Sequence, residues 1–186
     1  HTYLRNVRKS IELFREENIP LQAEMAELQQ QYGQITGAMT VEVEGKTYTL
    51  QQAAKFLEHP DRSKREMVYH LIQQRRLQDQ DKLNDLFNKL VDIRNKEAAN
   101  TGMSDYIEYR FKELGRFDYG KDDCYRFHEA VKQHVLPLVS VLHEKKKVEL
   151  GVDSLRPWDL EAEPQGKKPL HPFKTSEELL DKTIDC

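Results

Sequence analysis

The chain has 186 residues, of which 38% are hydrophobic and 33% are charged, and its formal net charge is -3. That length fits one domain or little more, and the hydrophobic fraction is too large for a disordered chain. The slightly acidic balance argues against a general nucleic-acid surface. We expect neither a membrane span nor a secretory signal, because no apolar run reaches the ~18 residues that a span requires.

The cysteines and the chain ends give two further expectations. Cys124 and Cys186 are the only cysteines, and two cysteines do not form a disulfide framework. A cytoplasmic protein is therefore expected. The first residue is His1, which leads directly into a helical pattern, and the last residues carry no helix stop signal. We therefore expect both ends to lie within structured parts of a longer protein.

The first sixty residues predict two helices, a hairpin and a short helix. Apolar residues recur at three- and four-residue steps over residues 2–18, and again after Pro20 as far as Tyr32. The stretch "TVEVEGKTYTL" then alternates with a period of two, and Gly45 suits the positive φ of a type II′ turn. This predicts a β-hairpin at about residues 40–50, followed by a short helix to about residue 58.

The remainder predicts a mainly α fold. Asp61 is the expected N-cap of a helical stretch that reaches about residue 99 and is either one helix or two. A brief helix over 104–114 leads into the loop "GRFDYG" at 115–120. A long helix over 121–149 should bend at Pro137. An extended strand is expected near 155–160, then a loop over 161–173 and another helix. The expected buried face of the long helix consists of Cys124, Phe127, His128, Val131, Val135, Leu138 and Leu142.

The segment "FHEAVKQH" contains His and Glu residues but lacks the spacing of a zinc site. His128 and His134 are six residues apart, which places them ~240° round a helix, so they cannot share an ion. Cys124 and His128 stand at i and i+4, but two ligands do not complete a tetrahedral site. The interpretation is that this segment binds no metal, and that Cys124 and His128 lie on an apolar stripe.

Several segments occur in an order that resembles a known family. They are "VEVEGKTYTLQQAAKFL", "DRSKREMVYHLI", "NTGMSDYIEYRF", "FHEAVKQHVLPLV" and "LGVDSLRPWDL", of which "LRPWDL" is the most specific. The series resembles the oligoendopeptidase F branch of the M3 family of zinc metallopeptidases over essentially the whole chain. The implied fold is a helical segment of a zincin-type peptidase, with residues 1–150 as an N-terminal helical wall and 151–186 as the truncated start of the catalytic domain.

The resemblance also implies a function for the full-length parent. It would be a zinc-dependent metalloendopeptidase that hydrolyses short peptides, in which zinc lowers the pKa of a bound water. The family's His-Glu-x-x-His helix lies beyond "LRPWDL" and beyond this chain, so no catalytic or metal-binding residue can be assigned here. The isolated chain is expected to be inactive and to bind no zinc.

Three residues of "LRPWDL" are candidates for the substrate cleft: Arg156, Trp158 and Asp159. The alternative for each is structural, since Trp158 can pack, Asp159 can tie down a neighbouring loop and Arg156 can form a surface ion pair. The alternative function is a non-enzymatic helical module that binds other proteins. Neither nucleic acid nor a membrane is an expected partner, and the oligomeric state is left open.

Overall fold

A computed structural model describes residues 2–164 and 172–184 of the chain. The described part is mainly α with one β-hairpin, as the sequence predicts. Parts of the expected 161–173 loop, and Cys186, lie outside the described residues. The elements are α1 (Thr2–Leu13), α2 (Asn18–Gly37), β1 (Thr40–Val43), β2 (Lys46–Thr49), α3 (Leu50–Ala54), the 3-10 turn η1 (Lys55–Glu58), α4 (Arg62–Leu77), α5 (Gln80–Asn100), α6 (Tyr106–Glu113), α7 (Lys121–Ala130), the π-helical turn η2 (Val131–Val135), α8 (Leu136–Leu150), the 3-10 turn η3 (Pro157–Asp159) and α9 (Ser176–Ile184).

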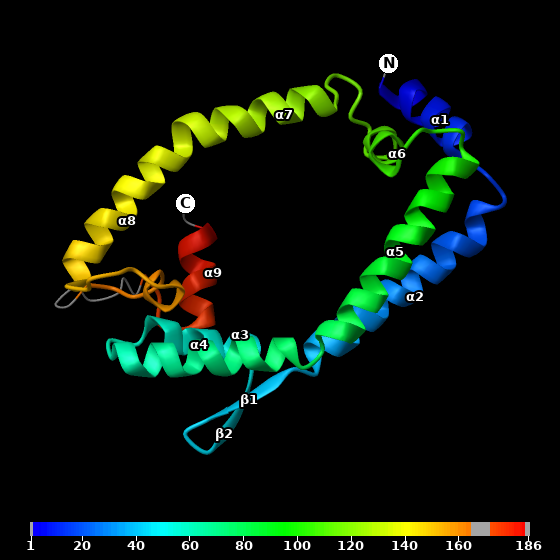
Figure 1. Ribbon diagram of the computed structural model, residues 1–186. Helices are drawn as coiled ribbons and strands as arrows, with labels where there is room; N and C mark the ends of the chain where they lie inside the picture. Colours follow the sequence, from blue (N-terminus) through cyan, green and yellow to red (C-terminus); the bar gives the residue numbers. More distant parts are fainter. Residues whose placement is uncertain (1, 165–171, 185–186) are drawn as a thin grey trace.

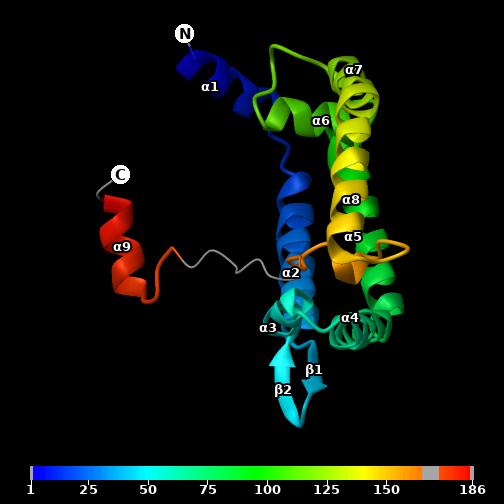
Figure 2. The ribbon, with the colours of Figure 1, turned by 90° about the vertical axis from the view of Figure 1, so that its left-hand side faces the viewer.

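The helices follow one another around a ring-like outline (Figure 1). α2 and α5 lie side by side, and α4 lies across one end of this pair, next to α3 and the hairpin. From the opposite end of the pair, α6 leads into α7 and α8, which arch back toward α4. Figure 2, turned by 90°, shows α9 standing apart from these helices.

The hairpin confirms the period-two pattern but not its expected turn type. Val43 pairs with Lys46 in the antiparallel register, which leaves a two-residue loop. Both loop residues have positive φ, 52° at Glu44 and 75° at Gly45. Positive φ at both central positions defines a type I′ turn, whereas the expected type II′ turn needs it at only the first. The type I′ turn matches the twist of the two strands better than an unprimed turn would.

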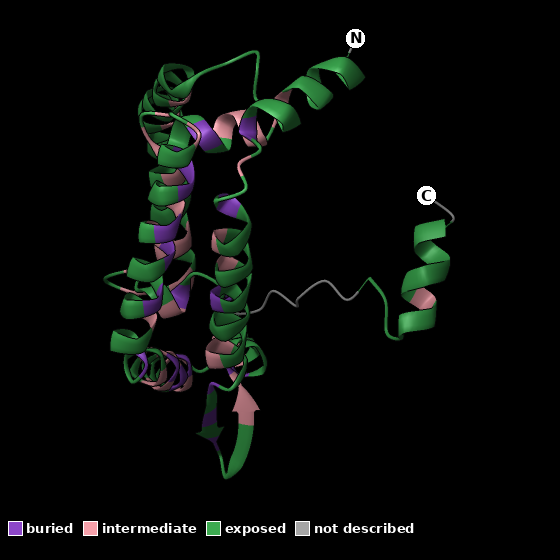
Figure 3. Ribbon diagram, turned by 90° about the vertical axis from the view of Figure 1, so that its right-hand side faces the viewer, coloured by how far each residue is buried: buried purple, intermediate pink, exposed green. Residues whose placement is uncertain are grey.

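Buried residues form three clusters along α2, α5 and the hairpin end of the molecule. Figure 3 colours the buried residues purple on the ribbon. The hairpin contributes Val41 and Val43, which pack against Val68 and Ile72 of α4. Between α2 and α5, Leu28 packs with Leu86, Leu90 and Ile93. A third, smaller cluster joins Leu13, Ala98 and Tyr109 where α1, α5 and α6 meet. The helical periodicity of α2 and α5 therefore predicted a real core.

A buried carboxylate joins the helices beside the third cluster. Glu97 is 1% exposed, and its Oε1 accepts hydrogen bonds from Gln22 Nε2 at 2.8 Å and from the Tyr109 hydroxyl at 3.0 Å. Burial, together with this hydrogen bond, raises the pKa of Tyr109, so the hydroxyl remains a donor. The Glu97 contacts thus connect α2, α5 and α6 through a carboxylate that is itself buried.

The long helix over 121–150 is interrupted just before Pro137, as expected. Residues Val131–Val135 form a π-helical turn, and the Leu136 N–H donates to the Val131 carbonyl. Proline has no N–H and crowds the preceding turn, so a wider turn relieves the clash that a regular α-helix would create. Figure 1 shows the resulting bend between α7 and α8.

The predicted buried face of this long helix is wrong for the described chain. Its large apolar residues are exposed, among them Phe127, Val135, Leu138 and Leu142, and neither α7 nor α8 contains a buried residue. The apolar stripe of α1 is likewise exposed except for Leu13. Spacing identifies the apolar side of a helix, but burial requires a neighbouring element, and none of the described elements covers these faces. No described helix is both long and apolar enough to cross a membrane.

Candidate functional site

The segment "LRPWDL" forms a 3-10 turn, not the extended strand expected near 155–160. Arg156 is extended, with φ -114° and ψ 163°, and the turn follows at Pro157–Asp159. Pro157 suits the first turn of a helix because its missing N–H needs no partner there. The Asp159 carboxylate accepts the Arg156 backbone N–H at 3.0 Å and closes the turn. Local capping therefore overrides the strand pattern.

Asp159 is completely buried and is bound by two arginines of α4. Arg62 Nε donates to Oδ1 at 3.1 Å and Arg62 Nη2 donates to Oδ2 at 2.8 Å. Arg65 Nη2 donates to Oδ1 at 2.9 Å. With the Arg156 N–H, each carboxylate oxygen accepts two hydrogen bonds, which is the full acceptor capacity of the group. We call Arg62, Arg65 and Asp159 the Asp159 clasp.

Arg65 also binds the backbone of the 155–160 segment and the backbone just before α4. Its Nε donates to the Trp158 carbonyl at 2.9 Å, and its Nη1 donates to the carbonyls of His59 at 2.8 Å and Pro60 at 3.0 Å. Arg65 is only 3% exposed, and a buried guanidinium is stable only when its donors and its charge are matched. The clasp therefore fixes the 155–160 segment against the start of α4.

The charge state of Asp159 follows from these contacts. Burial by itself would raise the pKa of the Asp159 carboxyl, but the hydrogen bonds from Arg62, Arg65 and the Arg156 N–H outweigh it, so the pKa lies below its ordinary value. The same carboxylate raises the pKa of the Arg62 guanidinium through their hydrogen bond. At neutral pH the clasp is an ion triad with one negative and two positive charges.

Trp158 packs on α4 beside the clasp. Its ring lies 5.4 Å from that of Tyr69 and 5.3 Å from that of His70, centroid to centroid, in tilted arrangements. Its indole N–H is buried and has no hydrogen-bond partner in the described part of the chain. The geometry therefore gives the Trp158 ring a packing role and leaves one donor unmatched.

Arg156 occupies a different position, at the edge of a groove of about 520 Å³ between α8 and the 153–160 segment. His143, Glu144 and Lys147 of α8 form the opposite side. Lys147 is paired with Glu144 at 2.8 Å, whereas Arg156 has no ion pair with any described residue. An exposed, unpaired guanidinium is available to bind a carboxylate from outside the chain.

The three candidates thus share one turn but differ in accessibility: Arg156 is exposed, Trp158 is half-buried and Asp159 is buried. For Asp159 the geometry favours the structural alternative, because no acceptor site on its carboxylate is left free. No spacing pattern in the sequence predicted Arg62 and Arg65 as the partners of Asp159. Their position in "DRSKRE", a second segment of the resemblance, was the one available signal.

The described residues do not fit a metal site. No group of three or more His, Cys, Asp or Glu side chains among residues 2–164 and 172–184 could hold a metal ion. His128 is exposed on α7 and Cys124 is half-buried one turn before it. Two such ligands do not complete the tetrahedral set that zinc requires.

The fold of the chain is similar to those of several solved structures. The fold matches a structure described as an oligoendopeptidase F, with a TM-score of 0.84 and 23% identity over 87% of this chain. It matches a second one, from Bacillus anthracis str. Ames, with a TM-score of 0.89 and 18% identity over 99% of this chain. PZ peptidase A bound to an inhibitor gives a TM-score of 0.82 and 22% identity over 85% of this chain. This chain spans 28%, 34% and 28% of those chains, respectively.

The sequence comparisons are more specific about the family than the fold is. No curated protein matches the chain. The sequence model of peptidase family M3, however, matches residues 55–181, which is more than half of the chain and includes both arginines of the clasp and Asp159. The chain therefore belongs to peptidase family M3.

Proposed function

We propose that the parent protein is a zinc-dependent endopeptidase of short peptides. Residues 1–150 would form a helical wall of its substrate cleft, and residues 151–186 would begin its catalytic domain. The family match over residues 55–181 carries this proposal, and the shared fold of the two assigned oligoendopeptidases supports it. The proposed setting is the cytoplasm, with neither nucleic acid nor a membrane as a partner.

Within this proposal the residues of "LRPWDL" have separate roles. Arg156 and Trp158 would lie near the substrate, with the exposed Arg156 guanidinium as the group that contacts it. Asp159 would be a positioning residue, because its carboxylate holds the turn to Arg62 and Arg65. The wall would contribute substrate positioning and exclusion of water, both of which lower a reaction barrier without bond-breaking chemistry.

Zinc and its catalytic base would come from parts of the parent that this chain does not contain. Because the described residues offer no ligand set for zinc, no catalytic step is assigned to any of them. On this proposal the 186-residue chain by itself would be inactive, since binding without a nucleophile cannot supply the barrier reduction that peptide hydrolysis needs.

The test compares hydrolysis of an internally quenched short peptide by the parent and by the 186-residue chain, each with and without a zinc chelator. We expect chelator-sensitive turnover from the parent only. Turnover by the 186-residue chain would place an active site within it. A folded parent without chelator-sensitive turnover would contradict the peptidase proposal.

A substitution in the parent tests the assignment of Arg156. We expect Arg156→Ala to lower kcat/KM by about tenfold, through the loss of one charge-assisted contact, with thermal unfolding unchanged. Arg76→Ala, which removes an exposed arginine at the end of α4, is the matched control. Equal activity of the two variants would remove Arg156 from the cleft.

One observation favours the second candidate function, a helical module that binds other proteins. The α7–α8 helix exposes several large apolar residues together, including Leu138, Val141 and Leu142, and such faces are typical of interaction surfaces. This candidate gains support if the parent folds and has no peptidase activity.

A further inference from the structure

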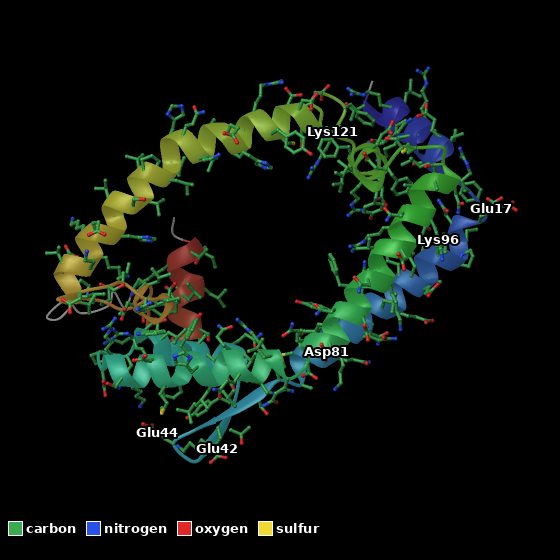
Figure 4. The ribbon with its side chains drawn as sticks, viewed as in Figure 1. Glu17, Glu42, Glu44, Asp81, Lys96 and Lys121 are labelled. Carbon is green, nitrogen blue, oxygen red and sulfur yellow. The ribbon has the colours of Figure 1, made fainter. Side chains whose placement is uncertain are left out.

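The loop "GRFDYG" between α6 and α7 lines a pocket of about 390 Å³, a volume typical of small-ligand sites. Lys121, labelled in Figure 4, marks the side where α7 begins, close to α6. The apolar lining consists of Ile107, Phe111, Phe117 and Tyr119, and the cationic groups are Lys112, Arg116 and Lys121. The two glycines that bracket this loop are visible in the sequence, but the loop has no role in the proposed function.

The pocket is held in shape by contacts of the loop with its neighbours. The guanidinium carbon of Arg5, on α1, lies 4.2 Å from the centre of the Phe117 ring. The rings of Phe111 and Tyr119 meet edge to face at 5.9 Å. Gly115, with φ 70°, makes the left-handed turn that starts the loop. The walls are therefore preorganised, which reduces the entropic cost of binding.

The two acidic groups of the pocket are already occupied by α6. The Asp105 carboxylate accepts the Glu108 backbone N–H at 2.8 Å, and this hydrogen bond is the main cause that lowers the pKa of Asp105. Asp105 also lies 3.7 Å from Lys121 Nζ. The Glu108 carboxylate accepts the backbone N–H of Ser104 at 3.1 Å and its hydroxyl at 3.0 Å. Both acids thus cap the helix, and Lys112 is paired with Glu12 of α1, which leaves one cation of the pocket uncompensated.

Arg116 is that cation. Its guanidinium carbon lies 4.9 Å from the centre of the Phe111 ring and 6.0 Å from that of Tyr119, and it has no ion pair with any described residue. A guanidinium stacked on a ring keeps its in-plane N–H groups free, and their fork matches the two oxygens of a carboxylate. The pocket therefore combines an aromatic surface with one available carboxylate binder.

We propose that this pocket binds the C-terminal residue of a peptide, with its α-carboxylate on Arg116 and a large apolar or aromatic side chain against Phe117 and Tyr119. A C-terminal residue places these two groups next to each other, as the pocket does. The exposed fractions of Ile107, Phe117 and Tyr119 are 46%, 37% and 46%. The pocket is therefore open to solvent, and the rest of a bound peptide can extend out of it. The proposal does not depend on peptidase activity.

The test titrates acetyl-Ala-Ala-Phe, as the free acid and as the C-terminal amide, into the ¹⁵N-labelled chain. NMR shifts of the backbone N–H groups of residues 115–121 report binding. We expect saturable shifts with the acid and affinity at least about tenfold weaker with the amide, because the amide loses the charge-assisted pair. Acetyl-Phe-Ala-Ala as the free acid should also bind about tenfold more weakly, since its aromatic group is not next to the carboxylate.

The variant Arg116→Gln should weaken binding of the acid by about tenfold and remove the difference between acid and amide. Its side chain is exposed, so the fold should be unaffected, and circular dichroism verifies this. Arg76→Gln is the matched control and should bind like the unaltered chain. The proposal is overturned if no saturable shifts occur, if acid and amide bind equally, or if Arg116→Gln binds the acid with unchanged affinity.

Discussion

The paired helices α2 and α5 and the bent helix of α7 and α8 show the same sequence pattern with opposite outcomes. In the pair, Leu86 and Leu90 are 6% and 7% exposed, whereas Leu138 and Leu142 of α8 are 65% and 63% exposed. Both sets recur at helical spacing. Periodicity therefore reports which face of a helix can be buried, and the tertiary arrangement decides whether it is.

The comparison extends to how each region is attached. The pair is joined by an apolar cluster and by the buried Glu97 contacts. The end of α8 is attached through the segment that follows it, where the Asp159 clasp binds α4 and Lys146 Nζ donates to the Leu160 carbonyl. One region is held along its length by burial of apolar surface, and the other is held at its end by buried charge.

The largest expected effect comes from breaking the clasp. Asp159→Ala leaves the buried Arg65 guanidinium without its counter-ion, and removal of one partner from a buried pair typically costs about 3–5 kcal/mol. We expect the free energy of unfolding, measured by urea denaturation with far-UV circular dichroism, to fall by that amount. Asp92→Ala, at an exposed position of α5, should change it by less than about 0.5 kcal/mol. Similar values for the two variants would mean that the clasp contributes little.

The contribution of the clasp should also depend on pH. The pKa of Asp159 lies below its ordinary value of 3.8 in the folded chain, so the unfolded state binds the proton more readily. The stabilisation is then complete above the unfolded-state pKa and is lost as the pH falls through the folded-state pKa. We expect the stability difference between the unaltered chain and Asp159→Asn to be constant at neutral pH and to shrink below pH 3.8. A difference that stays constant into strong acid would contradict the charged form of Asp159.

In the helix pair, Leu90→Ala should lower the free energy of unfolding by about 2–5 kcal/mol, because it removes buried methyl groups and leaves a cavity. Leu90→Met, which nearly conserves volume, should cost less than about 1.5 kcal/mol. Urea denaturation of both variants verifies the ordering. If Leu90→Ala is tolerated as well as Leu90→Met, α2 and α5 are not packed as described.

A smaller effect is expected where α6 joins the pair. Tyr109→Phe removes the hydroxyl that donates to Glu97 and leaves a buried carboxylate with one donor fewer, which typically costs about 1–3 kcal/mol. Tyr106→Phe is the matched control, because Tyr106 stacks on Tyr109 but no hydrogen bond of its hydroxyl is found in the described part of the chain. Thermal unfolding followed by circular dichroism separates the two. Equal losses would assign the effect to ring packing instead of the hydrogen bond.

The sequence predicted local features well because their causes are local. Asp61 caps α4 by accepting the Ser63 N–H, and the break before Pro137 follows from the chemistry of one residue. The clasp was not predicted, because its partners Arg65 and Asp159 are 94 positions apart in the sequence and no spacing rule relates residues so far apart. The same limit applies to the candidate site: "LRPWDL" was identified, but the division between exposed Arg156 and buried Asp159 depends on where α4 lies.

The smallest expected effect sharpens the comparison between the two regions. Leu138→Ala repeats the substitution made at Leu90, but on a residue that is 65% exposed in α8. Little apolar surface returns to water and no cavity forms, so the free energy of unfolding of the 186-residue chain should change by less than about 0.5 kcal/mol. The same substitution in the parent measures whether another part of that protein covers this face. A loss of about 2 kcal/mol or more in the 186-residue chain itself, comparable to that of Leu90→Ala, would show that the face is already packed there, and the contrast between α5 and α8 would no longer hold.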